Sequence, residues 1–135
     1  MKNKGFTLIE IAIVLCILGL LTAIGIPNLT GYMQTTYSKL DLVTGTLIAE
    51  GMLQAMTEGY KIQPTYDTYI EIKEEGILLD KNQQSISFTH YISEIPIPKE
   101  KHYTHFAYQY TSTGALRIVK IHSDSSKVQV YPFIQ

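Results

Sequence analysis

A long apolar run near the N-terminus, interrupted by one carboxylate, constrains this chain more than any other feature. Within residues 6–26 the only polar side chains are those of Thr7, Glu10 and Thr22. A helix of this length spans about 30 Å, which is enough to cross the hydrocarbon core of a bilayer. A charged side chain inside such a span costs about 2.5–3.5 kcal/mol on insertion scales. We therefore predict a transmembrane helix over residues 6–26 and treat Glu10 as a candidate functional residue.

The flanks of the apolar run favour one orientation and leave a second interpretation open. Lys2 and Lys4 precede the run and favour a cytoplasmic N-terminus, because basic flanks stay on that side of the membrane. The opposing interpretation is an ordinary secretory signal, cleaved after the small-x-small triplet at residues 23–25. Three features count against it: the run is long, Glu10 interrupts it early, and a helical pattern continues beyond Pro27.

The end of the apolar run is the weakest part of the predicted helix. Pro27 lacks a backbone donor and clashes with the preceding turn, which predicts a kink. Gly19 and Gly25 each lower the helical preference by about 1 kcal/mol relative to alanine. A lipid environment hides this weakness, whereas a different environment can expose it.

Beyond Pro27 the spacing of apolar residues predicts an amphipathic helix over residues 27–59 that continues the first. Polar residues, Asp41 among them, fall on the opposite side. Gly59 is expected just after the last turn, because glycine readily adopts the left-handed conformation that closes many helices. The predicted apolar stripe consists of Leu29, Met33, Tyr37, Leu40, Val43 and Leu47.

After Pro64 the apolar pattern alternates, which predicts an antiparallel sheet that forms one globular domain with the amphipathic helix. The fold class is therefore α+β, with residues 60–135 as a small sheet packed on the long helix. Phe106, Tyr108 and Tyr110 share one face of a strand; we expect them to pack on the apolar stripe, with ligand binding as the alternative. The predicted strands are 66–73, 85–92, 104–111, 115–122 and 127–134, the last three as a meander.

Charge and cysteine content exclude some functions. The 135 residues include 11 Lys+Arg and 12 Asp+Glu, a formal net charge of −1, which gives no electrostatic case for a nucleic-acid partner. Cys16 is the only cysteine, so an intrachain disulfide is impossible. Its thiol is expected to act as a small hydrophobe within the apolar run.

The candidate chemical sites are weak. His102 and His105 lack a nearby cysteine or paired carboxylate, which favours structural histidines over a metal site. Asp124 stands among three serines that could offer oxygen ligands to calcium, but this composition is first that of a turn. There is no catalytic Ser/His/Asp or Cys/His spacing and no phosphate loop, so we predict neither an enzyme nor a metal or cofactor site.

The N-terminal motif resembles that of a known protein family. The segment KGFTLIE at residues 4–10, followed by apolar residues and Pro27, resembles the processing motif of type IV pilins and of the pseudopilins of type II secretion. The resemblance implies that a prepilin peptidase removes the leader, residues 1–5, by cutting between Gly5 and Phe6, and that Phe6 is then N-methylated. It also implies that Glu10 aligns subunits, and a neighbour's Glu10 can neutralise the new amine of Phe6 in a low-dielectric helix bundle.

The resemblance further implies partners and a location. A single-pass protein of the bacterial inner membrane would meet an assembly platform and join copies of itself and other pilins in a helical filament, as a pilus or a periplasmic pseudopilus. Many type IV pilins close a C-terminal loop with two cysteines, which this chain lacks. That departure leaves open a pseudopilin, a minor or priming pilin, or a competence pilin. A monomeric, membrane-anchored periplasmic or surface binding domain is the rival from another class, and an exported enzyme is third.

Overall fold

A computed structural model describes residues 5–132, apart from the side chains of residues 27 and 28. Most of the predicted leader, with Lys2 and Lys4, and the end of the predicted strand 127–134 lie outside the described residues. The chain divides into two compact units, residues 1–36 and 37–135. Helix α1 (Leu8–Thr57) begins in the first unit and ends in the second.

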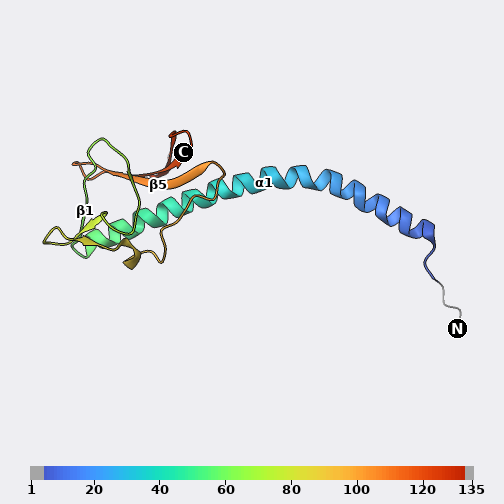
Figure 1. Ribbon diagram of the computed structural model, residues 1–135, viewed down its shortest axis with the longest axis horizontal. Coiled ribbons are helices and arrows are strands. Elements are labelled where there is room, and N and C mark those ends of the chain that lie inside the picture. Colours follow the sequence, from blue (N-terminus) through green and yellow to red (C-terminus); the bar gives the residue numbers. More distant parts are fainter. Residues whose placement is uncertain (1–4, 133–135) are drawn as a thin grey trace. The chain divides into compact units, whose positions relative to one another are not determined.

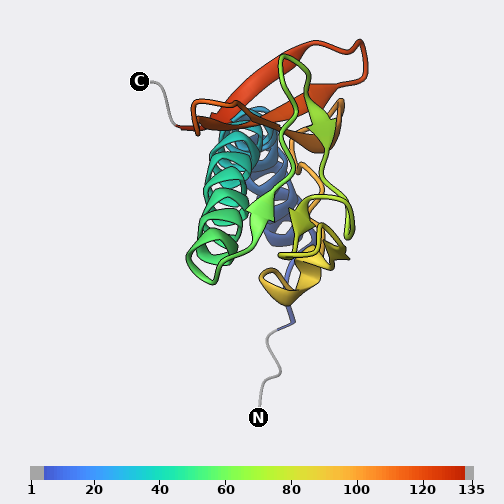
Figure 2. The same cartoon turned by 90° about the vertical axis from the view of Figure 1, so that its left-hand side faces the viewer.

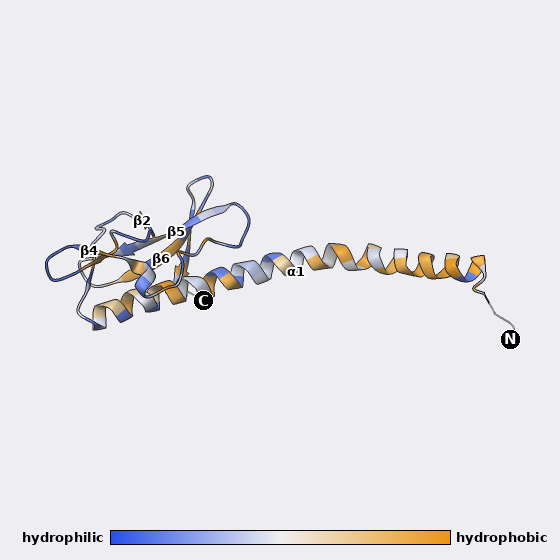
Figure 3. Cartoon of the chain, turned by 60° about the horizontal axis from the view of Figure 1, so that its bottom comes forward, coloured by the Kyte–Doolittle hydropathy of each residue, from blue (hydrophilic) through white to orange (hydrophobic). Residues whose placement is uncertain are grey.

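The first unit consists of the N-terminal part of α1. The helix begins at Leu8, two residues later than predicted, because Thr7 serves as its N-cap. It continues through Gly19, Gly25 and Pro27 without a break in its helical assignment. Every described side chain of residues 5–26 is exposed, and this part of the helix is coloured mostly as hydrophobic in Figure 3. The helix is long and apolar enough to cross a membrane.

The C-terminal end of α1 closes as the sequence predicts. Gly59 has φ +95°, the left-handed conformation that glycine adopts without strain. The amide of Tyr60 donates to the carbonyl of Ala55 at 3.1 Å, and that of Gly59 donates to Met56 at 3.1 Å. These two bonds make a Schellman motif, so the last carbonyls of the helix are satisfied and the chain turns back toward the sheet.

Two antiparallel sheets complete the second unit (Figure 1). The smaller has the order β1-β3-β4, from β1 (Lys61–Ile62), β3 (Leu78–Leu79) and β4 (Ser85–Ile86). The larger has the order β2-β5-β6-β7, from β2 (Ile70–Glu71), β5 (Tyr103–Tyr110), β6 (Leu116–His122) and β7 (Lys127–Tyr131). The α+β class and the C-terminal meander are thereby confirmed.

The first two predicted strands are mostly wrong. Only Ile70–Glu71 is a strand within residues 66–73, and only Ser85–Ile86 within residues 85–92. The chain then forms a 3₁₀ turn, η1 (Phe88–His90), which places the Phe88 side chain fully in the core. The alternating apolar residues of segment 85–92 are therefore compatible with a short strand followed by a turn, as well as with one long strand. The two-residue strands β1 and β3 were missed because they are too short to produce a periodic pattern.

The buried face of α1 also differs from the prediction. Leu40 and Leu47, members of the predicted stripe, are 43% and 55% exposed. The face that packs under the sheet instead carries Ile48 and Met52, which are almost fully buried together with Phe106 and Tyr108. The aromatic strand face thus packs on the helix as expected, but on a different stripe. Burial raises the pKa of the Tyr108 phenol to about 12.

A close approach of strand and helix explains why this face turns inward. A Cβ at Gly45 would lie 2.4 Å from Cγ2 of Val130, far inside van der Waals contact. Only a glycine therefore lets β7 lie this close to α1, and Figure 2 shows the C-terminal strands crossing the teal part of the helix. Gly45 lies within the continuous helix α1, where its lack of a side chain admits Val130.

Candidate functional site

The candidate site is the first turn of α1, where Thr7 and Glu10 cap the helix reciprocally. The amide of Thr7 donates to Oε2 of Glu10 at 2.7 Å, and the Thr7 hydroxyl donates to the same oxygen at 2.8 Å. The amide of Glu10 in turn donates to Oγ1 of Thr7 at 3.3 Å. This is a capping box, whose Thr-x-x-Glu spacing ahead of an apolar run is visible in the sequence and was missed.

The capping box leaves half of the Glu10 carboxylate available. Its hydrogen bonds go to Oε2, and among residues 5–132 no hydrogen bond reaches Oε1. The side chain is exposed, and so is Phe6, at 85%. The first turn therefore presents an anionic acceptor and an aromatic side chain on an apolar helix. A cationic donor from outside the chain is the partner that this arrangement fits best.

Gly5 makes no close packing contact with the part of the chain that the structure describes. A Cβ placed there meets nothing within 4 Å, and the same holds for Gly19 and Gly25. The need for a small residue at Gly5 would therefore have to come from another molecule. The kink at Pro27 and the weak segment from Gly19 stay predictions, since the helical assignment is continuous there.

The other predicted candidates do not come together as a metal site. Nδ1 of His105 hydrogen-bonds with Oγ1 of Thr104 at 2.8 Å, while the ring of His102 lies 5.8 Å from that of His122. Within the described part of the chain, no group of three or more His, Cys, Asp or Glu side chains could hold a metal ion. The two histidines of the His102–His105 pair therefore have separate surroundings.

The serine-rich segment around Asp124 is a turn. The amide of Ser126 donates to Oδ1 of Asp124 at 2.8 Å, and Nδ1 of His122 lies 2.9 Å from the same oxygen. Hydrogen bonds from Ser126, followed by the contact with His122, lower the pKa of Asp124 to about 2. Ser125 takes the left-handed conformation, with φ 69°. One oxygen of the candidate calcium ligand is thus already used within the turn.

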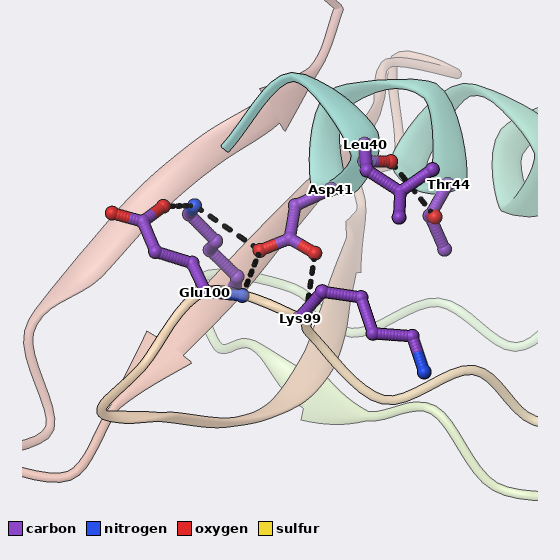
Figure 4. A network of polar contacts seen from close by, with 6 residues as sticks. Leu40, Asp41, Thr44, Lys99 and Glu100 are labelled. Atoms are coloured by element: carbon purple, nitrogen blue, oxygen red, sulfur yellow. Dashed lines mark hydrogen bonds and ion pairs between the residues drawn. The ribbon is translucent and has the colours of Figure 1, made fainter. Parts of the chain in front are cut away.

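Sequence reasoning missed a buried cluster of charges that joins α1 to the larger sheet. Lys120 on β6 lies 3.4 Å from Oδ2 of Asp41 and contacts Oε2 of Glu100. Asp41 also accepts hydrogen bonds from the backbone amides of Lys99, at 2.7 Å, and Glu100, at 3.2 Å (Figure 4). The available signal was the charged Lys120, which stands between the apolar residues Val119 and Ile121 of the LRIVKIH strand.

Comparison with known proteins supports the reading of the N-terminal segment. Residues 1–26 match the family model described as the prokaryotic N-terminal methylation motif. The chain is 40% identical over 58 residues to the type IV major pilin protein PilE1 of Neisseria gonorrhoeae. The N-terminal segment of this chain is therefore similar to that of type IV pilins. The gonococcal match covers 43% of this chain and 33% of the pilin.

A second relative gives the same result. The fimbrial protein of Neisseria meningitidis serogroup B is 40% identical over 58 residues, or 43% of this chain and 32% of that protein. The chain thus spans about a third of the length of the curated relatives it matches. No solved structure matches the chain.

Proposed function

We propose that the chain is a structural subunit of a type IV pilus-like filament rather than an enzyme. The observation that carries this proposal is the match to the methylation motif on a helix whose apolar side chains are exposed on all sides. Such a surface cannot remain in water and needs either lipid or other helices around it. A filament subunit meets both needs, because lipid surrounds its helix in the membrane and the helices of other subunits surround it in the filament.

In this proposal a prepilin peptidase cuts between Gly5 and Phe6 on the cytoplasmic side of the inner membrane, and Phe6 is then N-methylated. The new amine of Phe6 is cationic, and Oε1 of a neighbour's Glu10 is the acceptor for it. The pair forms inside a helix bundle, where an unpaired charge would be strongly destabilising. Subunits that meet in this register are therefore favoured over those that do not, and the weak segment at 19–27 lets the helices adapt.

The partners follow from the same proposal. They are the peptidase, the inner-membrane assembly platform, further copies of this chain, and other pilins or pseudopilins. A pseudopilus of type II secretion, a competence filament and a minor or priming position in any of these filaments use the same first turn. The identity of the neighbouring genes would distinguish a type IV pilus, a type II secretion pseudopilus and a competence filament.

A second candidate is a monomeric, membrane-anchored binding domain. An open groove of about 500 Å³ favours it, lined in part by Met56, Tyr60 and Tyr110. The aromatic strand face itself is not available, because Phe106 and Tyr108 lie in the core. A binding domain of this kind would need neither the cut at Gly5 nor the carboxylate of Glu10.

The test is to replace Glu10 with alanine in cells that assemble the filament. We expect Glu10→Ala to insert into the membrane normally and to be lost from sheared filaments, while Glu50→Ala, an exposed glutamate on the same helix, is incorporated as the wild type is. Normal incorporation of Glu10→Ala would overturn the role of Glu10. Intact mass should show a chain that begins at methylated Phe6, whereas a chain that begins after Gly25 would favour an ordinary signal sequence.

A further inference from the structure

A lysine, an aspartate and a glutamate meet at the junction of α1, the loop before β5, and β6. The side chains of Lys120 and Asp41 are 3% and 1% exposed, so neither is hydrated as an isolated charge would be. Nζ of Lys120 lies 3.4 Å from Oδ2 of Asp41 and also contacts Oε2 of Glu100. We propose that Lys120 and Asp41 condense into an intramolecular amide bond, with Glu100 as the proton carrier.

The surroundings of Asp41 suit an electrophile. Its Oδ1 accepts a hydrogen bond from the backbone amide of Lys99 at 2.7 Å, drawn as a dashed line in Figure 4. When an amine adds to Cγ, negative charge develops on an oxygen, and a fixed amide donor stabilises that charge as in an oxyanion hole. Oδ1 is therefore the oxygen that remains as the amide carbonyl. Oδ2 accepts a longer hydrogen bond, 3.2 Å, from the backbone amide of Glu100, and it faces Lys120, so it is the oxygen that leaves.

The surroundings of Lys120 suit a nucleophile. Its Nζ lies 4.3 Å from the centroid of the Tyr103 ring, which shields one side of the amine from water. Glu100 contacts the same nitrogen and is 30% exposed, so it reaches from the buried amine toward solvent. A carboxylate in this position can accept a proton from the ammonium and release it to the departing oxygen.

The reaction balances within these three side chains. The Lys120 ammonium gives one proton to Glu100, and the neutral amine adds to Cγ of Asp41. Glu100 passes this proton to Oδ2, then takes a second proton from the nitrogen and delivers it to Oδ2 as the tetrahedral intermediate collapses. The C–Oδ2 bond breaks, one water molecule departs, and Glu100 returns to its starting state. A cation and an anion become a neutral amide and water, so no oxidant or further reactant is needed.

The fold supplies both the driving force and the proximity. Two buried charges are unfavourable unless they are well paired, and condensation removes both from the interior. The backbone already holds the two groups together, so the step is unimolecular. The product would link positions 79 residues apart in a chain whose only cysteine is Cys16. A buried ion pair that never condenses is the competing state, and it has a different mass.

The test is the intact mass of the full chain, purified in detergent and then denatured. We expect it to be lighter than its sequence by one water molecule after any leader removal and methylation are accounted for. Trypsin does not cut after an acylated lysine, so digestion should yield one branched peptide that joins residues 40–61 to residues 118–127. A folded wild-type chain with its full sequence mass, and with separate peptides ending at Lys120 and Lys61, would overturn the proposal.

Variants assign the roles. Asp41→Asn should lose one ammonia molecule in place of water, a signature that an ion pair cannot produce. Glu100→Gln should keep the full sequence mass or convert at least tenfold more slowly, whereas Glu50→Gln on the exposed side of α1 should convert as the wild type does. Wild-type conversion in Glu100→Gln would remove Glu100 from the reaction. The mass of the folded chain does not depend on filament assembly, so failure here leaves the proposed function unaffected.

Discussion

Single residues in this chain carry charges whose partners lie at very different distances along the sequence. Glu10 caps its own helix through Thr7, three residues away, whereas Asp41 is partnered by Lys120 from another element. Asp124 belongs to the first kind, because Ser126 and His122 are both two residues away. Local partners follow from local conformation, so the properties of Asp124 can be tested by changing one side chain.

The turn at Asp124 should make the stability of the second unit depend on pH in acid. The folded chain holds the pKa of Asp124 at about 2, below its ordinary value of 3.8, so the folded state favours the carboxylate. The stabilisation is present above pH 3.8 and is lost as the pH falls from 3.8 toward 2. Thermal melting of the wild type and of Asp124→Asn should therefore converge across this window. A constant difference between them would contradict the assignment.

At the scale of elements, α1 and the larger sheet meet through one tight contact and one apolar face, in addition to the ion pair of Asp41 and Lys120. Gly45 admits Val130, and Ile48 and Met52 continue the same inward face toward the end of the helix. Leu40 and Leu47 face outward. The helix therefore has two apolar faces in this unit, and the described residues bury only the one with Ile48 and Met52.

The close approach at Gly45 predicts an unusual effect of alanine. Alanine favours a helix over glycine by about 1 kcal/mol, but its methyl group would overlap Val130, and overpacking costs about 1–3 kcal/mol. We expect Gly45→Ala to lower the free energy of unfolding in denaturant melts of the full chain. Gly51→Ala, whose nearest neighbour would be 3.4 Å away, should be neutral or stabilising. Equal effects of the two variants would show that β7 does not rest on Gly45.

Two adjacent residues distinguish the faces of the helix. Ile48 is buried and Leu47 is 55% exposed, so truncation should affect only the first. We expect Ile48→Ala to lower the free energy of unfolding by about 2–5 kcal/mol. Leu47→Ala should change it by less than about 0.5 kcal/mol, as exposed sites do. If chemical denaturation showed a larger loss for Leu47→Ala than for Ile48→Ala, the buried face would be the stripe predicted from sequence spacing.

For the whole molecule, the apolar surface is distributed unevenly between the two units. In residues 5–26 every described side chain is exposed, while residues 37–135 contain the cluster of buried apolar side chains. Burial of apolar area is the main favourable term in folding, so the second unit has its own source of stability. The first unit depends on lipid or on other helices.

This division predicts the behaviour of a truncated chain. A fragment of residues 28–135 should remain in the soluble fraction, with a cooperative thermal transition, because it keeps the core around Ile48 and Tyr108. The full chain should sediment with membranes and require detergent, because its exposed apolar helix is retained. A soluble full chain, or a fragment that melts without cooperativity, would contradict the division. Fractionation and circular dichroism measure both properties.

Sequence by itself determined the features that depend on neighbouring residues. The apolar run, the left-handed Gly59 and the C-terminal meander could be predicted because helix length, caps and strand alternation are local patterns. The Thr7–Glu10 capping box was equally local and could have been found. The pilin-like segment rests on the same contiguous residues.

Only the tertiary structure decided which face of α1 is buried and which charges meet. Spacing shows where apolar residues recur on a helix, but two apolar faces compete, and contact with β7 at Gly45 selects the one with Ile48. Asp41 reads as a surface residue until Lys99, Glu100 and Lys120 are placed around it. These partners lie 58 to 79 residues away in the chain, and no local pattern records an interaction across that distance.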